Sequence, residues 1–263
     1  MAVAQKRSTL VLWKDVIFAL WIRQLRSKFT DKFGVSWLVV QPVIFILALS
    51  FIRGRISGDD VSGIPMFVFM LLGFLPVIQF MQAWGTVARS IKQDKPLYAF
   101  RQVMPMASFV TASIIECLSN IIVLIILCII AIMFLGIEIF PEDPIGIMLY
   151  LLEIQLVAYF LGIVTGLGAL FIEEISKVEQ LLQRPMLFIS GAFFTLSDFP
   201  EEVWPYLSWN PVLQAVELSR HAYSNDFYLV SAISPTYLHT CVLFLMFIAF
   251  SLYIVLWKKG ISR

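Results

Sequence analysis

The stretch PMLFISGAFFTLSDFPEEVWPYLSWNPVLQAVELSRHAYSNDF, residues 185–227, carries the pattern that decides the fold. It begins with an uncharged apolar run, Pro185–Ser197. An α-helix rises about 1.5 Å per residue, so this run is too short to cross a hydrocarbon core of about 30 Å. An acidic turn separates it from a second uncharged run, Val203–Val216, which prolines interrupt. Two short apolar pieces around a polar turn predict half-helices that enter a membrane and return on the same side.

The chain as a whole is too apolar for a soluble domain. Of its 263 residues, 60% are hydrophobic, and the mean hydropathy is +0.87, which indicates an integral membrane protein. Irregular backbone at membrane depth is tolerated only where protein or a water-filled cavity shields it. We therefore expect a shielded cavity beside residues 185–227 and place the function there.

Five long apolar stretches predict further membrane segments. They are Phe33–Ile52, Ile64–Ala88, Gln102–Ile137, Pro144–Ile172 and Thr240–Trp257. With a fifth span and periplasmic re-entrant region at 185–235, the predicted fold is an all-α integral membrane domain, residues 1–263, with six transmembrane segments. Residues 8–30 are too charged to cross a bilayer and predict a helix in the membrane interface; the alternative is a cytosolic helix packed on a partner.

The basic residues orient the chain. With the N-terminus inside, cytoplasmic segments collect 16 of the 19 Lys and Arg residues and leave Arg53, Arg55 and Arg220 outside. Because cytoplasmic loops of membrane proteins carry an excess of Lys and Arg, both termini are expected in the cytoplasm. No cleavable signal is expected, since Lys14 and Asp15 interrupt the first apolar run.

The chain carries no nucleotide-binding P-loop motif, and Glu116 and Glu153 are the only ionisable residues inside the predicted spans. An ion-coupled carrier needs more such groups, so energy is expected from a separate ATPase subunit. The charged segment 89–101 predicts a cytoplasmic coupling helix that contacts this subunit; the alternative is a solvated loop. The residues expected to couple are Arg89, Lys92, Asp94, Lys95 and Arg101.

An aromatic and polar stripe marks the first predicted span. Trp37, Gln41 and Phe45 recur every fourth residue and share one helix face. Such a stripe suits a sugar chain, whose C–H faces stack on rings while amides meet hydroxyls, although it is also common in cores and lipid-facing surfaces. The remaining candidates for a substrate canal are Phe193, Phe194, Glu116 and Glu153. Each glutamate has a structural alternative, in which a hydrogen bond or an Arg neutralises it and it serves packing.

Catalytic patterns in the sequence are sparse. His221 and Asp226 have the H-x-x-x-x-D spacing of lipid acyltransferases, without a basic phosphate-binding motif nearby. His221 and His239 are too few for a metal site, so no metal and no cofactor are expected on this chain. A polytopic acyl or glycosyl transferase is the alternative from another class of protein, and His221→Ala would separate the two.

Several short motifs resemble those of ABC-2 type transport permeases, the membrane halves of ATP-driven exporters. One set is Ser190-Gly191, Pro200, Asn210-Pro211 and Arg220; the other is Arg26, Gly34, Trp37 and Pro42. Val35-Ser36 stand where the second pattern has Leu-Gly. Within this superfamily the chain is most similar to the capsular polysaccharide exporters of the KpsM, BexB and CtrC type.

The resemblance implies a homodimer in the bacterial inner membrane, bound to two copies of an ABC ATPase that carries ATP and Mg. It also implies a periplasmic co-polymerase or adaptor and a lipid-linked anionic polysaccharide as substrate, and no nucleic acid. The substrate would enter from the cytoplasm beside Arg23, Arg26 and Lys28, which also face membrane lipid. Other polysaccharides, such as O-antigen or teichoic acid, and small hydrophobic drugs remain alternative substrates.

Overall fold

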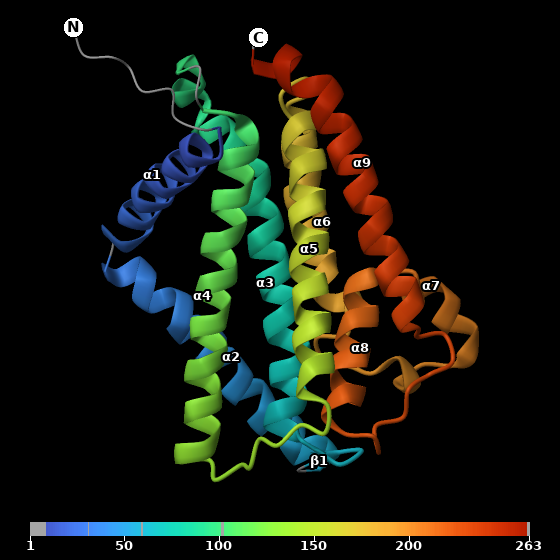
Figure 1. The fold of residues 1–263 in the computed structure, drawn as a ribbon. Coiled ribbons are helices and arrows are strands. Elements are labelled where there is room, and N and C mark those ends of the chain that lie inside the picture. Colours follow the sequence, from blue (N-terminus) through green and yellow to red (C-terminus); the bar gives the residue numbers. More distant parts are fainter. Residues whose placement is uncertain (1–8, 31, 59, 101–102, 262–263) are drawn as a thin grey trace, which may run out of the picture.

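The computed structural model describes residues 9–30, 32–58, 60–100 and 103–261. The fold is a bundle of α-helices with one small β-hairpin (Figure 1). The longer helices are α1 (Thr9–Thr30), α2 (Lys32–Ser57), α3 (Met66–Gln93), α4 (Pro105–Phe134), α5 (Pro144–Gly168), α6 (Glu174–Ile189), α8 (Pro211–Tyr223) and α9 (Pro235–Ile261). The short elements are β1 (Asp60–Val61), β2 (Ile64–Pro65), α7 (Trp204–Ser208) and the 3-10 turns η1 (Lys95–Ala99), η2 (Leu196–Asp198) and η3 (Glu201–Val203).

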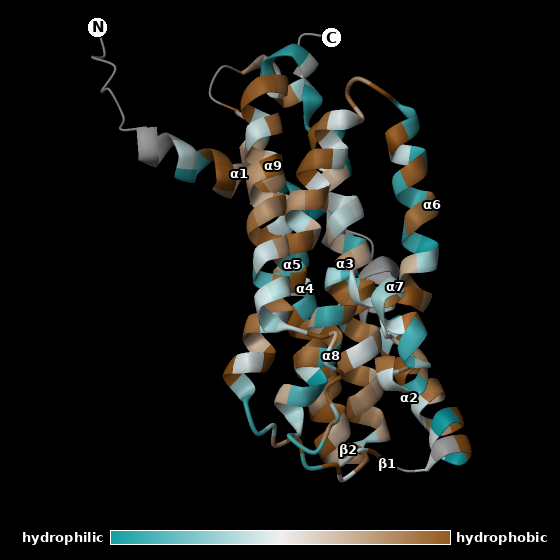
Figure 2. Cartoon of the chain, turned by 90° about the vertical axis from the view of Figure 1, so that its right-hand side faces the viewer, coloured by the Kyte–Doolittle hydropathy of each residue, from teal (hydrophilic) through white to brown (hydrophobic). Residues whose placement is uncertain are grey.

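Within the described residues, four helices are long and apolar enough to cross a membrane: α3, α4, α5 and α9. They run side by side, and apolar residues cover most of their length (Figure 2). Each overlaps one of the spans predicted from the sequence. The chain is therefore a helical integral membrane protein, as predicted.

Helix α3 forms the centre of the bundle, where α5 packs closely against it. A Cβ atom on Gly162 would lie 2.6 Å from Val87, and one on Gly166 would lie 2.7 Å from the backbone oxygen of Ala88. The two glycines are four residues apart and face α3, the arrangement that lets two membrane helices approach closely. Trp84 adds a hydrogen bond across this contact, from Nε1 to Oγ1 of Thr165 at 3.1 Å.

A tight β-hairpin joins α2 to α3 at the end of the bundle opposite the last turns of α9 (Figure 1). Its turn residues, Ser62 and Gly63, have φ values of 50° and 78°. Positive φ at both central positions is the geometry of the two-residue turns that match the twist of paired strands. The turn directs the chain from α2 into the central helix.

Two segments differ from the sequence-based prediction in their boundaries. Helix α6 does not begin at Pro185 but starts in the charged segment at Glu174 and continues through Pro185 to Ile189. Segment 89–101 is not one helix: Arg89 and Lys92 belong to the last turns of α3, and η1 follows after Asp94. Inside a helix, proline removes one backbone hydrogen bond and kinks the helix, and in α6 the turns on both sides of Pro185 remain helical.

Candidate functional site

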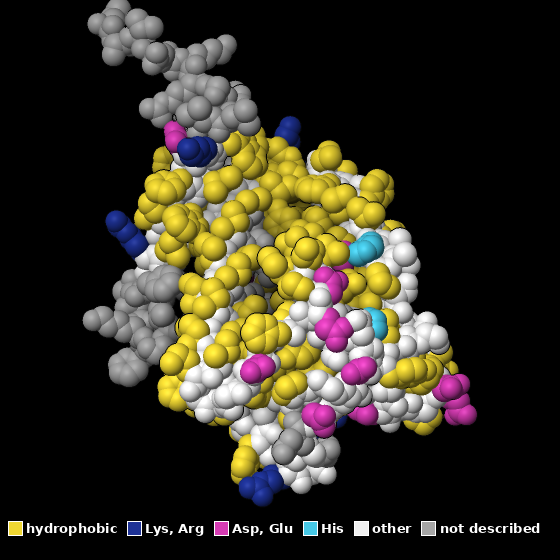
Figure 3. Space-filling view, turned by 60° about the horizontal axis from the view of Figure 1, so that its bottom comes forward, with side chains coloured by type: hydrophobic (Ala, Val, Ile, Leu, Met, Phe, Trp, Pro, Cys, Tyr) yellow, Lys and Arg dark blue, Asp and Glu magenta, His cyan; other side chains and the backbone are white. Residues whose placement is uncertain are grey.

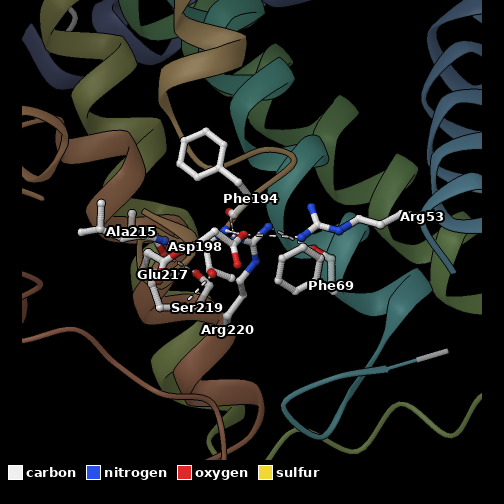
Figure 4. A network of polar contacts seen from close by, with 11 residues as sticks. Arg53, Phe69, Phe194, Asp198, Ala215, Glu217, Ser219 and Arg220 are labelled. Carbon is white, nitrogen blue, oxygen red and sulfur yellow. Dashed lines mark hydrogen bonds and ion pairs between the residues drawn. The ribbon is translucent and has the colours of Figure 1, made fainter. Parts of the chain in front are cut away.

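The α6–α8 region is built around Arg220, whose side chain is fully buried (Figure 4). Its Nη1 donates to the carbonyl oxygen of Phe194 at 2.8 Å, and its Nη2 donates to that of Phe69 at 3.4 Å. The guanidinium also lies 3.7 Å from the centroid of the Phe69 ring. Arg220 thus ties α8 to the loop after α6 and to the central helix α3.

Glu217 is the counter-charge of Arg220 one turn earlier on α8. Its Oε1 lies 3.4 Å from Nη1 of Arg220 and accepts from the backbone N–H of Leu196 at 3.3 Å. Burial raises the pKa of the Glu217 carboxyl from its ordinary value of 4.5 to about 7, although Arg220 acts in the opposite direction. Among the described residues, neither Oε2 of Glu217 nor Nε of Arg220 has a hydrogen-bond partner.

Small and capping residues allow the chain to fold around this pair. Gly191 ends α6 at φ +74°, a conformation that side chains disfavour. Asn210 caps α8 through the N–H of Val212 and donates to Oγ of Ser190 at 2.9 Å. A Cβ atom on Gly73 would lie 2.2 Å from Nη2 of Arg220. Most residues of the motif that contains Ser190-Gly191, Asn210-Pro211 and Arg220 therefore lie close together, and they support the reversal of the chain between α6 and α8.

The segment between α6 and α8 also contacts α2. Arg53 places Nη2 3.5 Å from Oδ2 of Asp198, and its guanidinium carbon lies 5.0 Å from the centroid of the Phe69 ring. Asp198 accepts in addition from the backbone N–H of Thr195 at 2.9 Å. The end of the molecule around this contact carries exposed acidic side chains (Figure 3). They include Glu138, Glu142, Asp143, Glu201, Glu202 and Asp226.

A row of aromatic rings links two of the predicted canal residues. Phe45 of α2 stacks on Phe74 of α3 with ring centroids 5.7 Å apart, and Phe74 lies 5.8 Å from Phe193. Phe193 continues the row to Phe188 of α6 at 6.0 Å. The predicted residue Phe194 is not part of this row and packs edge-on against Phe199. The structure therefore brings Phe45 and Phe193 to one side of α3.

The stripe on α2 is largely uncovered. The Trp37 side chain is 60% exposed and Phe45 is 49% exposed, and Gln41 between them is exposed as well. Helix α6, at the other end of the aromatic row, likewise exposes Leu181 and Phe188. These faces form one surface of α2 and α6, joined by the aromatic row, which we call the α2–α6 surface.

The two glutamates lie elsewhere. Glu116 is buried on α4, the helix against which α1 packs. Glu153 on α5 is buried and contacts Nδ1 of His239 on α9. Neither glutamate belongs to the aromatic row. Sequence analysis did not pair Glu153 with His239, because the partners are far apart in the chain.

The predicted coupling residues occupy different environments. Asp94 is buried and accepts from Nη1 of Arg23 at 3.1 Å and from Nε2 of Gln24 at 3.3 Å. Arg89 is half-exposed and lies 4.0 Å from Glu179 of α6, while Lys92 and Lys95 are exposed. Asp94 therefore joins α1 to the end of α3.

Of the three residues predicted where substrate enters, Arg23 makes this contact with Asp94 and Arg26 is exposed. The side chain of Lys28 lies outside what the structure describes, as does the coupling residue Arg101.

The acyltransferase spacing does not form a catalytic pair. Nδ1 of His221 lies 3.0 Å from the carbonyl oxygen of Phe227, which can only accept, so the ring donates to the backbone. Asp226 is exposed in the loop after α8. His221 thus supports the loop after α8.

Comparison with known proteins identifies the class of this chain. The family described as ABC-2 type transporter matches residues 15–224, which include α2–α6 and the Arg220 region. The chain belongs to this family of membrane transporter subunits.

Individual relatives extend over nearly the whole chain. The polysialic acid transport protein KpsM of Escherichia coli is 29% identical over 254 residues, which cover 94% of this chain and 95% of that protein. The capsule polysaccharide export inner-membrane protein CtrC of Neisseria meningitidis serogroup A is 23% identical over 255 residues, covering 97% and 95%. BexB of Haemophilus influenzae, with the same description, is 24% identical over 221 residues, covering 84% and 83%.

Proposed function

We propose that this chain is the inner-membrane permease of an ATP-driven exporter of lipid-linked capsular polysaccharide. The observation that carries the proposal is the similarity over nearly the full length to proteins named for polysialic acid transport and capsule polysaccharide export. The fold agrees with a passive conduit, because the buried charged residues described above make contacts between helices.

We place the translocation path along the α2–α6 surface. Aromatic rings and an amide on an exposed helix face can stack on sugar rings and meet hydroxyl groups. One copy of the chain leaves this surface open, so a closed canal requires a second copy. The chain therefore acts as a homodimer, with Trp37, Gln41, Phe45 and Phe193 facing the substrate.

The proposed topology has six membrane segments and both termini in the cytoplasm. Helices α2 to α5 supply four segments, α6 with the turn around Arg220 supplies the fifth and the re-entrant region, and α9 supplies the last. The exposed acids near the β-hairpin support a periplasmic position for that end, since basic residues gather at the other. This periplasmic end is where an adaptor would continue the route.

A separate ABC ATPase, in two copies, supplies the energy at the cytoplasmic end. Arg89, Lys92 and Lys95 at the end of α3 are exposed there and available to a partner. Asp94 fixes this end to α1, so movement of the ATPase would reach α1 and α2 as well as α3. ATP and Mg belong to that subunit.

Reconstitution tests the proposal. The chain is inserted into vesicles alone and together with its proposed ABC ATPase partner, and lipid-linked capsular polysaccharide is supplied on the nucleotide side. We expect ATP-dependent transfer of the glycolipid only with both subunits. Vectorial transport by the chain alone, or failure of the two proteins to associate, would overturn the proposal.

A drug exporter and a transferase predict other outcomes of the same assay. Stimulation of ATP hydrolysis by small hydrophobic drugs but not by glycolipid would indicate the first. A covalently altered glycolipid, lost in His221→Ala, would indicate the second.

A further inference from the structure

A groove lies between α1 and α4, away from the α2–α6 surface. Five α1 residues between Trp13 and Trp21 face Thr111 and Ile114 of α4 around a volume of about 470 Å³. Figure 1 shows α1 leaning along the upper part of α4. The volume falls in the range of small-molecule binding sites, about 300–1,000 Å³.

Apolar side chains form most of the groove's walls, and the hydroxyl of Thr111 donates to the carbonyl oxygen of Ala107 at 2.7 Å. Lys14 is the one charged residue among those that line it, and its side chain is exposed. The groove therefore offers apolar walls and one cation to an occupant that is itself mostly apolar.

The groove lies near one end of α4. Thr111 is six residues after the first residue of that helix, which is roughly 9 Å along its axis. Helices in a membrane interface bury their apolar face about 5–10 Å into the boundary between headgroups and acyl chains. Trp13 and Trp21 suit the same depth, since tryptophan concentrates at membrane–water interfaces. The groove therefore lies at a depth where its ligand enters from the bilayer.

We propose that this groove binds an anionic phospholipid of the surrounding bilayer. One acyl chain lies between Phe18 and Ile114, both of which are partly exposed. The anionic headgroup pairs with Lys14. The bound lipid fastens the interfacial helix α1 to the bundle at a position distinct from the Arg23–Asp94 contact. The proposal does not depend on which substrate is exported.

Photo-crosslinking tests it. The full chain is placed in nanodiscs of phosphatidylcholine with and without phosphatidylglycerol, one of the two lipids carrying a diazirine in its acyl chain, and labelled peptides are identified by mass spectrometry. No exported glycolipid is present. We expect label on peptides containing Phe18 and Ile114, stronger from phosphatidylglycerol. Nanodiscs have the same lipid in both leaflets, so the outcome does not depend on the orientation of the chain.

Two pairs of variants locate the site. Ile114→Trp fills the groove and should lower this label about tenfold, the effect of roughly 1.4 kcal/mol; Ile121→Trp, on an exposed face of the same helix, should leave it unchanged. Lys14→Gln should reduce the preference for phosphatidylglycerol about fivefold, and Lys177→Gln on exposed α6 should not. Because Lys14 is a surface residue, its variant remains informative if Ile114→Trp fails to fold.

Two results would overturn the proposal. Equal labelling in both tryptophan variants would show that the lipid does not occupy the groove. Equal labelling of these peptides from phosphatidylcholine and phosphatidylglycerol would show that the groove does not select an anionic headgroup.

Discussion

Helices α3 and α2 are both long and apolar, yet the bundle uses them in opposite ways. In α3, 78% of the most apolar 18-residue window is buried, and glycines of α5 pack against its backbone. In α2, the stripe of Trp37, Gln41 and Phe45 is exposed. The difference teaches that apolarity places a helix in the membrane, whereas small residues and buried polar contacts decide which helix becomes the centre. It follows that α3 sets stability, whereas the exposed face of α2 is open to the substrate contacts proposed above.

The largest effect on stability is expected at Arg220, which joins the segment between α6 and α8 to α3. Arg220→Ala leaves Glu217 buried without its counter-charge and removes donors to Phe194 and Phe69. We expect a loss of about 3–5 kcal/mol of unfolding free energy, measured as a lower melting temperature and yield in detergent. Arg53→Ala is the matched control, because its partly exposed ion pair contributes about 0–1 kcal/mol. Equal losses in both variants would contradict the assignment of Arg220 as the central contact.

The contact between α3 and α5 gives the next effect. Gly166→Ala places a Cβ atom 2.7 Å from the Ala88 backbone oxygen, so the helices must separate, at a cost of about 1–3 kcal/mol. At Gly85 the nearest atoms are the flexible ends of Arg89 and Gln183, and alanine there should be neutral or stabilising. Thermal unfolding of the two variants measures the difference. If the two melting temperatures changed alike, α3 would not be the tightly packed centre.

A smaller effect concerns pH. The pKa of Glu217 is raised in the folded protein, so its contribution to stability is full below about pH 4.5 and is lost as pH rises toward 7. Glu217→Gln cannot titrate, so the difference between the wild-type and variant melting temperatures should change with pH, the wild type losing stability relative to the variant as pH rises from about 4.5 toward 7. The measurement is thermal unfolding across that range. A difference independent of pH would show that burial does not govern this carboxyl.

The smallest effect on stability is expected on α2. Trp37→Ala changes an exposed side chain and should alter unfolding free energy by no more than about 0.5 kcal/mol. Glycolipid export should nevertheless fall roughly fivefold, the loss of one aromatic contact of about 1 kcal/mol. Unfolding and vesicle export are measured on the same preparation. Normal export together with a large loss of stability would reverse the roles assigned to α2 and α3.

The membrane character and the four long spans could be predicted from apolar runs alone. The residues around Arg220 were recognised as a motif, but their contacts were not predictable: Arg220 binds Phe194 and Phe69, which are 26 and 151 positions away. The contact between Glu153 and His239, which are 86 positions apart, was not predicted for the same reason. The course of α6 through Pro185 was not predicted, because proline alone does not fix a helix boundary when the flanking turns are helical.

Cysteine labelling of α2 tests most directly whether its exposed face meets the translocation path. Gln41→Cys and Ile125→Cys, the latter an exposed apolar position on α4, are placed in a chain whose native cysteines are replaced by serine. In membranes containing the ATPase, we predict that Gln41→Cys reacts with a water-soluble maleimide and that the label blocks export, while Ile125→Cys stays unmodified. If Gln41→Cys is as inert as Ile125→Cys, or if its modification leaves export intact, α2 does not line the path.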